Sequence, residues 1–284
     1  MAYTTKDVHD RVKKILYTLT GITLADNKDI MISNRIDKLF RDSKYKGDIM
    51  DLLDLVENGS YVTEFINSFT TNKTHFFRED FHFTDLKNRV LPQFAKDGSK
   101  VNMYCSASST GEEPYSMAMT VMEARENAGK FLDASIIATD IDTNVLQYAA
   151  NGIYRFSKSS KEFPDWIKPQ KYFKRRVQKN LSGEEVLIKV KDDLKRMISF
   201  QVMNLNDSNY PFSNAQFDVI FCRNVLIYFS AEDQNEILRK LFKHLKIGGT
   251  LYLGHSENPH DLINYVNRVG QNIFVKEKEI NWLL

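Results

Sequence analysis

The first part of the chain repeats apolar residues at intervals of three and four positions, the spacing that places them on one face of an α-helix. Glycine interrupts these runs at Gly21, Gly47 and Gly59, where we expect helices to end. The pattern predicts a small all-helical N-terminal domain over residues 1–77. Its expected helices are 8–21 (VHDRVKKILYTLTG), 30–43 (IMISNRIDKLFRDS), 48–56 (DIMDLLDLV) and 61–69 (YVTEFINSF).

From about residue 80 the pattern changes to short apolar runs that alternate with amphipathic ones. This alternation is typical of a parallel sheet covered by helices on both faces. The sequence therefore predicts an α/β fold over 78–284, with a doubly wound, mostly parallel sheet. The helix over 231–246 is expected to end at Gly248 and Gly249, and 271–279 to form a final antiparallel edge strand. The other expected strands are 101–106, 134–140, 198–205, 218–224 and 249–255, and the other helices 116–127 and 144–152.

One segment, about 155–200, interrupts the alternation. It contains thirteen Lys and Arg against six Asp and Glu, and the turn signal SGEE precedes the alternating run VLIKVKDDL. We expect a small, basic β subdomain containing a hairpin, inserted into the main sheet.

Composition narrows the possible functions. The chain has 39 Lys and Arg against 37 Asp and Glu, so no overall positive field favours nucleic acid as a partner. Its two cysteines lie in separate apolar runs, which favours reduced core thiols and a cytoplasmic location. No apolar run is long enough for membrane insertion, and the histidines lack metal-ligand spacing, so no metal site is expected.

The stretch 105–116, CSASSTGEEPYS, joins a predicted strand to a predicted helix. In an open α/β sheet, ligands bind beyond the carboxyl ends of strands, near such a turn. Small residues and Gly111 let the backbone approach a ligand. The alternative is a helix start in which Thr110 and Glu113 form a capping box. The turn is not the glycine-rich dinucleotide fingerprint.

A second strand, over 134–140, ends in Asp140, where a βαβ unit places an acid that binds ribose hydroxyls. The turn and the acid together indicate a nucleoside-bearing ligand, either a nicotinamide dinucleotide or S-adenosylmethionine. The missing pyrophosphate loop favours S-adenosylmethionine.

Two further runs contain candidate site residues. In 217–229, FDVIFCRNVLIYF, a buried strand ends in Arg223 and Asn224, and Tyr228 follows. A cation at such a position needs a partner, which is a ligand or the acid of a salt bridge. The run 70–80, TTNKTHFFRED, places Asn72, Thr74 and Arg78 near the domain junction, where the alternatives are a helix cap and a solvated arginine.

These runs, with 253–258 (LGHSEN), resemble in order and spacing the CheR-type chemotaxis receptor glutamate methyltransferases over essentially the whole chain. The resemblance implies a Rossmann-like methyltransferase fold. It also implies transfer of methyl from S-adenosylmethionine, with S-adenosylhomocysteine as product, to glutamate side chains on the cytoplasmic helical bundle of methyl-accepting chemoreceptors.

The resemblance also implies residue roles. Arg78 and Tyr228 would lie near the transferred methyl group and orient the acceptor. On the second helix, Arg35, Lys38 and Arg41 would face the receptor. Cofactor contacts would come from Asn72, Thr74, Arg78, Glu113, Asp140, Asn204, Leu205, Cys222, Arg223 and Asn224.

One departure from the family concerns receptor tethering. Members that bind a receptor's C-terminal pentapeptide carry a Gly-x-Gly turn in the β subdomain, where this chain has Gly183 alone. Two alternative functions are a methyltransferase for RNA or a small molecule, and a signalling adaptor that binds the cofactor without turnover. We expect a monomer.

Overall fold

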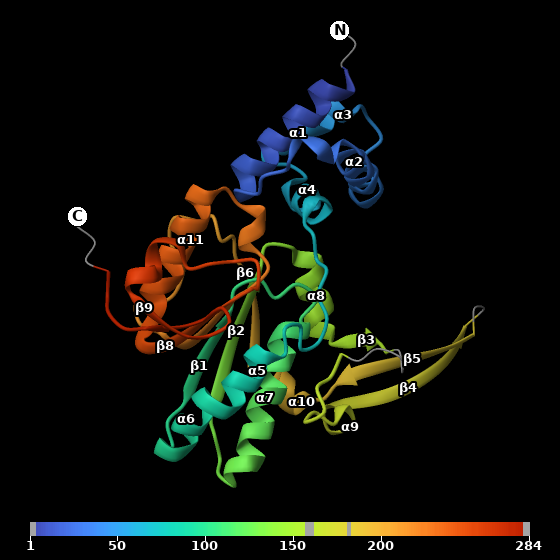
Figure 1. Cartoon of the computed structure of the whole chain (residues 1–284). Helices are drawn as coiled ribbons and strands as arrows, with labels where there is room; N and C mark the ends of the chain where they lie inside the picture. The colour runs from blue at the N-terminus through green and yellow to red at the C-terminus, as the bar shows by residue number, and fades with distance from the viewer. Residues whose placement is uncertain (1–3, 157–161, 181–182, 281–284) are drawn as a thin grey trace.

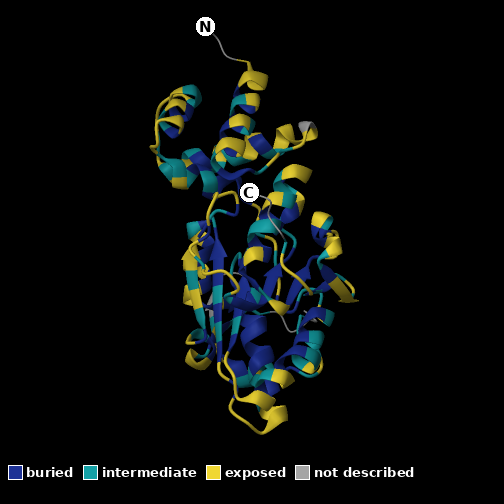
Figure 2. Ribbon diagram, turned by 90° about the vertical axis from the view of Figure 1, so that its left-hand side faces the viewer, coloured by how far each residue is buried: buried dark blue, intermediate teal, exposed yellow. Residues whose placement is uncertain are grey.

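The computed structural model describes residues 4–156, 162–180 and 183–280. The N-terminal helices lie at one end of the molecule, the main sheet lies between layers of helices, and a small second sheet projects from the side (Figure 1). Buried residues concentrate in the main sheet and in the helices packed on it (Figure 2). The N-terminal helices are α1 (Thr5–Thr20), α2 (Asp29–Ser43), α3 (Ile49–Glu57) and α4 (Val62–Phe69), with the 3-10 turn η1 (Asp26–Lys28) before α2.

Local sequence accounts for the ends of α1. Thr4 and Asp7 form a capping box at its start, and Gly21 ends it in the left-handed conformation. The apolar faces of α1 to α4 share a core that contains Val12, Ile32 and Phe65, separate from the clusters under the main sheet. The exact division into domains at 77/78 remains a prediction.

The main sheet has the strand order β6-β2-β1-β7-β8-β10-β9, and β10 runs antiparallel to both of its neighbours. The predicted doubly wound, mostly parallel sheet is confirmed. The chain leaves β1 in one direction for β2 and β6, and the later strands lie on the other side of β1, so a ligand-binding crevice is expected where β1 meets β7. The strands are β1 (Val101–Cys105), β2 (Ala134–Asp140), β6 (Ile198–Val202), β7 (Phe217–Cys222), β8 (Leu245–Leu253), β9 (Val266–Gly270) and β10 (Ile273–Lys276).

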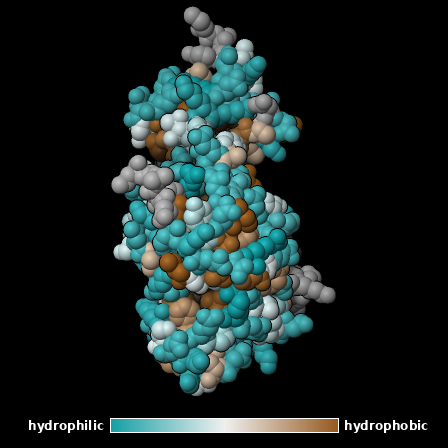
Figure 3. All heavy atoms as spheres, turned by 60° about the vertical axis from the view of Figure 1, so that its left-hand side comes forward, coloured by the Kyte–Doolittle hydropathy of each residue, from teal (hydrophilic) through white to brown (hydrophobic). Residues whose placement is uncertain are grey.

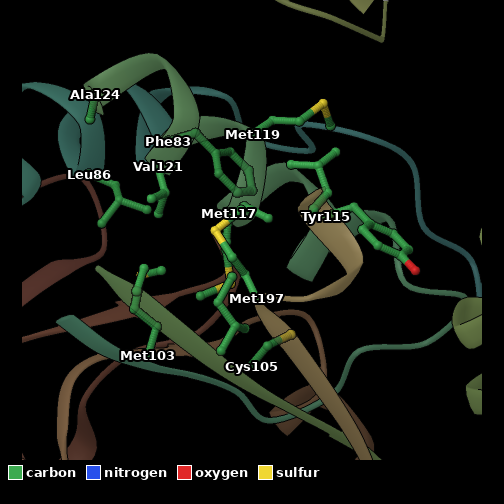
Figure 4. Packing of buried hydrophobic residues seen from close by; sticks show 14 of the residues in the cluster. Phe83, Leu86, Met103, Cys105, Tyr115, Met117, Met119, Val121, Ala124 and Met197 are labelled. Atoms are coloured by element: carbon green, nitrogen blue, oxygen red, sulfur yellow. The ribbon is translucent and has the colours of Figure 1, made fainter. Parts of the chain in front are cut away.

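Helices cover both faces of this sheet. Successive residues of β7 therefore join different cores, with Phe221 in the cluster under α7 and Cys222 in the cluster under α11. Figure 4 shows Met103 and Cys105 of β1 on the side that faces Met117 of α7. The helices are α5 (Phe81–Asp85), the π-helical turn η2 (Leu86–Val90), α6 (Leu91–Asp97), α7 (Glu112–Ala128), α8 (Thr143–Asn151) and α11 (Ala231–His244), with 3-10 turns η3 (Leu226–Tyr228) and η4 (His260–Asn264).

The two cysteines are buried free thiols, as the sequence predicts. Cys105 and Cys222 belong to cores on opposite faces of the sheet, which explains why they do not pair.

The basic insertion forms the second sheet, of order β3-β5-β4. Its hairpin pairs Asn180 with Gly183 in antiparallel register, and the turn residues 181–182 lie outside the described part. The expectation about the Gly-x-Gly turn therefore stays a prediction. The elements are β3 (Ile153–Arg155), α9 (Pro169–Tyr172), β4 (Phe173–Asn180), β5 (Gly183–Val190) and α10 (Asp192–Lys195).

Three local predictions were wrong. The helix over 231–246 ends at His244, and Gly248 and Gly249 lie inside β8, because that strand starts directly at Leu245. Strand β10 is not the edge of the sheet, since β9 pairs with its outer side. Gly47 ends no helix, because α2 stops at Ser43 and Lys44 adopts the left-handed conformation.

The face drawn in Figure 3 is mostly hydrophilic, with hydrophobic residues gathered in its middle. Within the described residues, we find no helix with the length and apolar character needed to cross a bilayer.

Candidate active site

A cavity of about 890 Å³ lies at the carboxyl ends of the central strands, under the connection between α1 and α2. This is the position that the strand order predicts. Segments distant in sequence form its wall, and ten of the predicted site residues are among them. These ten are Asn72, Thr74, Arg78, Glu113, Asp140, Asn204, Leu205, Arg223, Asn224 and Tyr228.

The turn after β1 forms the floor of the cavity. The capping box that the sequence offered as an alternative does not form there. Thr110 Oγ1 donates a hydrogen bond to Glu112 at 2.6 Å, and Glu113 turns toward the sheet. The N-cap residue of α7 is Gly111, which has a φ of 96°, and no side chain caps the helix there. A Cβ atom at Gly111 would lie 2.7 Å from Cβ of Ala149, so both the conformation and the close packing require glycine.

Asp140 is the carboxylate at the end of β2, and it is 9% exposed. Its oxygens accept hydrogen bonds from the backbone N–H of Ser109 at 2.8 Å and of Asp142 at 3.0 Å. Burial raises the pKa of Asp140 to about 6, against those two hydrogen bonds, which favour ionisation. A buried carboxylate on the wall of a cavity suits a ligand that brings hydroxyl donors.

Arg223 forms salt bridges, one of the two alternatives that the sequence left open, and its side chain also lines the cavity. Its guanidinium is fully buried and donates to Glu113 at 2.7 Å, and it lies 3.1 Å from a carboxylate oxygen of Glu79. It also donates to the backbone carbonyl of Arg78. Burial raises the pKa of Glu113, although Arg223 opposes the shift. Burial is also the largest single effect on Glu79 and raises its pKa, but Arg223 and the hydrogen bonds from Asn224 and His255 together outweigh it, so the pKa of Glu79 lies below its ordinary value.

The segment 70–80 is an irregular connection rather than a helix face. Asn72 Nδ2 donates to Asp142 at 2.8 Å, and the carbonyl of Asn72 accepts from Ser109 Oγ at 3.1 Å. Arg78 donates to the carbonyl of Lys73 at 3.1 Å and lines the cavity. The connection is thus tied to the ends of both β1 and β2.

The N-terminal helices also contact the site directly. The carbonyl of Tyr228, in η3, accepts the N–H of Thr23 at 2.8 Å. Asn204 Nδ2 donates to the carbonyl of Leu19, at the end of α1, at 2.9 Å. These bonds place the α1–α2 connection across the cavity.

Comparison with known proteins decides the family. A family model described as "CheR methyltransferase, SAM binding domain" matches residues 72–275, a span that includes the ten cavity residues. The chain belongs to the CheR methyltransferase family. It is therefore an S-adenosylmethionine-dependent methyltransferase, and the second of the two cofactor classes left open by the strand pattern is confirmed.

Curated relatives of this CheR methyltransferase carry the name chemotaxis protein methyltransferase. The Escherichia coli protein is 37% identical over 95% of this chain and 90% of its own, and the Borreliella burgdorferi protein 35% identical over 89% and 88%. The solved structure of the methyltransferase CalH with SAH covers 80% of this chain and 47% of its own, at 12% identity and a TM-score of 0.36, a likeness too low to support an argument.

Four predicted site residues of the CheR chain lie outside this cavity. The side chain of Cys222 is fully buried in the core under α11, and the predicted contact of Cys222 with the cofactor stays a prediction. Arg35 donates to the carbonyls of Ser68 and Thr70, and Lys38 to that of Asn67. Arg41 is exposed on α2.

Sequence reasoning missed three carboxylates that hold the site together: Glu79, Asp142 and Glu257. Asp142 caps α8 and binds Thr70 and Asn72. Two of the three stand next to predicted residues, Glu79 after Arg78 and Asp142 two positions after Asp140. The third, Glu257, lies in the run LGHSEN, and no local pattern pointed to the partners of the three carboxylates, which are far along the chain.

Proposed function

We propose that this CheR methyltransferase transfers methyl from S-adenosylmethionine to glutamate side chains on the cytoplasmic helical bundle of chemoreceptors, forming glutamyl methyl esters. The observation that carries the proposal is that Arg78 and Tyr228 share one cavity with Asp140 and Glu113. The same observation speaks against the adaptor, which could dispense with Arg78 and Tyr228.

The residues of the cavity fit the cofactor. Asp140 is a hydrogen-bond acceptor suited to the ribose hydroxyls. Glu113 is a carboxylate suited to the ammonium of the amino-acid portion, and Asn204 with Leu205 would border the adenine. The remaining contacts would come from Asn72, Thr74, Arg78, Arg223 and Asn224, all of which line the cavity.

A glutamate acceptor is already ionised at neutral pH, because its ordinary pKa is about 4.3. The site therefore needs no general base. The bound cofactor supplies a methyl group on an electron-deficient sulfur, and the chain must hold the acceptor oxygen about 3–3.5 Å from that group. Arg78 can pair with the incoming carboxylate, and the hydroxyl of Tyr228 can donate a hydrogen bond to it.

The basic face of α2 is the proposed receptor contact. Arg41, with a side chain 71% exposed, is available to an acidic helical partner. Arg35 and Lys38 hold the end of α4 through its carbonyls, so they would shape this face as well as contribute charge. We further propose that residues 1–77 and 78–284 are separate domains, and that the protein is a cytoplasmic monomer.

The test is transfer of tritiated methyl from S-adenosylmethionine to membranes that carry the organism's chemoreceptors. We expect label on the receptor that mild base releases as methanol, which identifies a carboxyl methyl ester. Arg78→Ala should abolish most of the label, whereas Arg196→Ala, on the exposed surface, should keep it. Cofactor binding without base-labile label on any receptor would contradict the proposal and favour an adaptor or another acceptor.

A further inference from the structure

The run LGHSEN, part of the family resemblance, contains a buried carboxylate with an unusual set of partners. Glu257 is 6% exposed. Its carboxylate accepts hydrogen bonds at 2.6–2.9 Å from four backbone N–H groups, three in the loop after β7 and one after β8. The donors are Asn224 and Gly254 to Oε2, and Val225 and Leu226 to Oε1.

Three of these donors are consecutive residues of the loop that leaves β7 and leads to Tyr228. Asn224 has a φ of 57°, the left-handed conformation that non-glycine residues seldom adopt. That turn points three successive N–H groups toward Glu257, and a backbone N–H shielded from water needs an acceptor. Both oxygens of Glu257 meet this need together. The carboxylate therefore holds the loop in this turned conformation.

The segment that carries Glu257 is itself fixed. Glu257 N donates to the carbonyl of Gly254 at 2.9 Å, and Asn272 Nδ2 donates to the carbonyls of Gly254 and Glu257. A Cβ atom at Gly254 would lie 2.7 Å from the backbone nitrogen of Asn224 and 2.7 Å from Oε2 of Glu257. Glycine is needed there because the loop rests directly against this position.

The same loop supplies the cavity wall with Asn224, Val225 and Tyr228. We propose that Glu257 is a positioning residue of the methyltransferase: its carboxylate holds the loop over 224–226 so that Asn224 faces the cofactor and Tyr228 the acceptor. Glu257 does not line the cavity and acts through the loop. The inference rests on the proposed function where kcat for receptor methylation is measured. Where binding of S-adenosylhomocysteine is measured, it does not.

The first experiment compares Glu257→Gln with a matched control, Asp218→Asn. The glutamine amide keeps one acceptor oxygen and turns N–H groups toward two of the four donors. Asp218 is also a buried carboxylate of the sheet that accepts a backbone N–H, from Asn102 at 2.8 Å, but it stands at the opposite end of β7. Both variants lose a buried charge, and only the first touches the loop.

We expect Glu257→Gln to weaken binding of S-adenosylhomocysteine, measured by calorimetry, at least ~3-fold, and to lower kcat for receptor methylation ~100-fold, the scale of a misplacement of about 1 Å. Asp218→Asn should leave both within about 2-fold of the wild type, as expected for a change outside the site. Equal effects of the two variants would overturn the inference. If the wild type methylates no receptor, the proposed function fails, and the binding comparison still tests Glu257.

A double-mutant cycle separates positioning from a general loss of structure. If Glu257 acts by placing Tyr228, Glu257→Gln should lower kcat far less in a Tyr228→Phe background than in the wild type. Gly254→Ala, which presses on the same loop without changing charge, should reproduce the kcat loss. The same fold-loss from Glu257→Gln in both backgrounds would assign Glu257 to the fold alone.

Discussion

Arg223 Nη1 lies 2.7 Å from Oε2 of Glu113, and the arginine side chain of this pair is wholly buried. The pair joins the end of β7 to the first turn of α7, so it stabilises the junction where the two strands that flank the cavity end. A second carboxylate, that of Glu79, also pairs with the Arg223 guanidinium and links it to the connection that carries Arg78. Ion pairs between residues of the chain therefore hold this part of the cavity wall together.

Replacing Arg223 should be costly. Arg223→Ala leaves the carboxylates of Glu79 and Glu113, whose side chains are each only 12% exposed, without their cation, and we expect a loss of about 3–5 kcal/mol in the free energy of unfolding. Arg196→Ala, at an exposed pair with Asp193, should lose less than about 1 kcal/mol. Urea denaturation measures both.

The loss in Arg223→Ala should depend on pH. Without the guanidinium the folded-state pKa of Glu79 rises above its unfolded value, and that of Glu113, which burial already raises, rises further, so their ionised forms destabilise the fold at neutral and higher pH. The deficit should shrink as pH falls and the carboxyls become protonated. A deficit that does not change between pH 8 and pH 5.5 would show that these carboxyls are not its source.

Asp140 should make cofactor affinity depend on pH. Burial raises the pKa of Asp140 to about 6, and hydroxyl donors prefer the ionised form. Affinity for S-adenosylhomocysteine should thus fall as pH is lowered through about 6. Asp140→Ala should weaken binding by about 1–3 kcal/mol at pH 8 and lose this pH dependence. Calorimetry across pH tests both, and unchanged affinity in the variant would remove Asp140 from the site.

Arg78→Ala should lower turnover much more than stability. Its side chain is partly exposed on the cavity wall, and the contact it makes with Lys73 is to a backbone carbonyl. We expect kcat to fall ~100-fold or more, with a cooperative unfolding transition near that of the wild type. Arg78→Lys keeps the charge but not the two-pronged geometry, and should recover only part of the rate. Failure to fold, with no separate catalytic defect, would make Arg78 structural.

Cys222→Ala should change stability and not cofactor binding. The thiol is buried under α11, away from the cavity lining. We expect a loss of about 1 kcal/mol in the free energy of unfolding and an unchanged affinity for S-adenosylhomocysteine. Weaker binding at unchanged stability would support the sequence-based assignment of Cys222 to the cofactor site.

The residues of α2 should separate into two groups. Arg41→Ala should raise KM for the receptor with little effect on folding, because the side chain is exposed. Arg35→Ala should destabilise the N-terminal helices, since Arg35 donates to two carbonyls at the end of α4. Receptor titration and thermal unfolding of both variants distinguish these outcomes. Identical behaviour of the two variants would argue against this division.

Much of the fold follows from the sequence because periodicity is a local property. The three- and four-residue spacing predicted α1 to α4, and the short apolar runs predicted the strands of the main sheet apart from β9. Boundaries next to glycine were less predictable. Gly248 and Gly249 read as a helix end, but they lie within β8, at the register shift between Leu245 and Thr250, which both pair with β7.

The sequence by itself indicated the family, the cofactor and ten residues of the cavity wall. Seven of the ten end or follow strands of the main sheet, whose carboxyl ends a parallel arrangement brings to one edge. Only the tertiary structure decided what those residues touch. Arg223 and Glu113 are 110 positions apart, and Glu257 reaches its loop across 31–33 positions. Such pairs arise from packing, which also turned Cys222 into the core and tied Arg35 to α4.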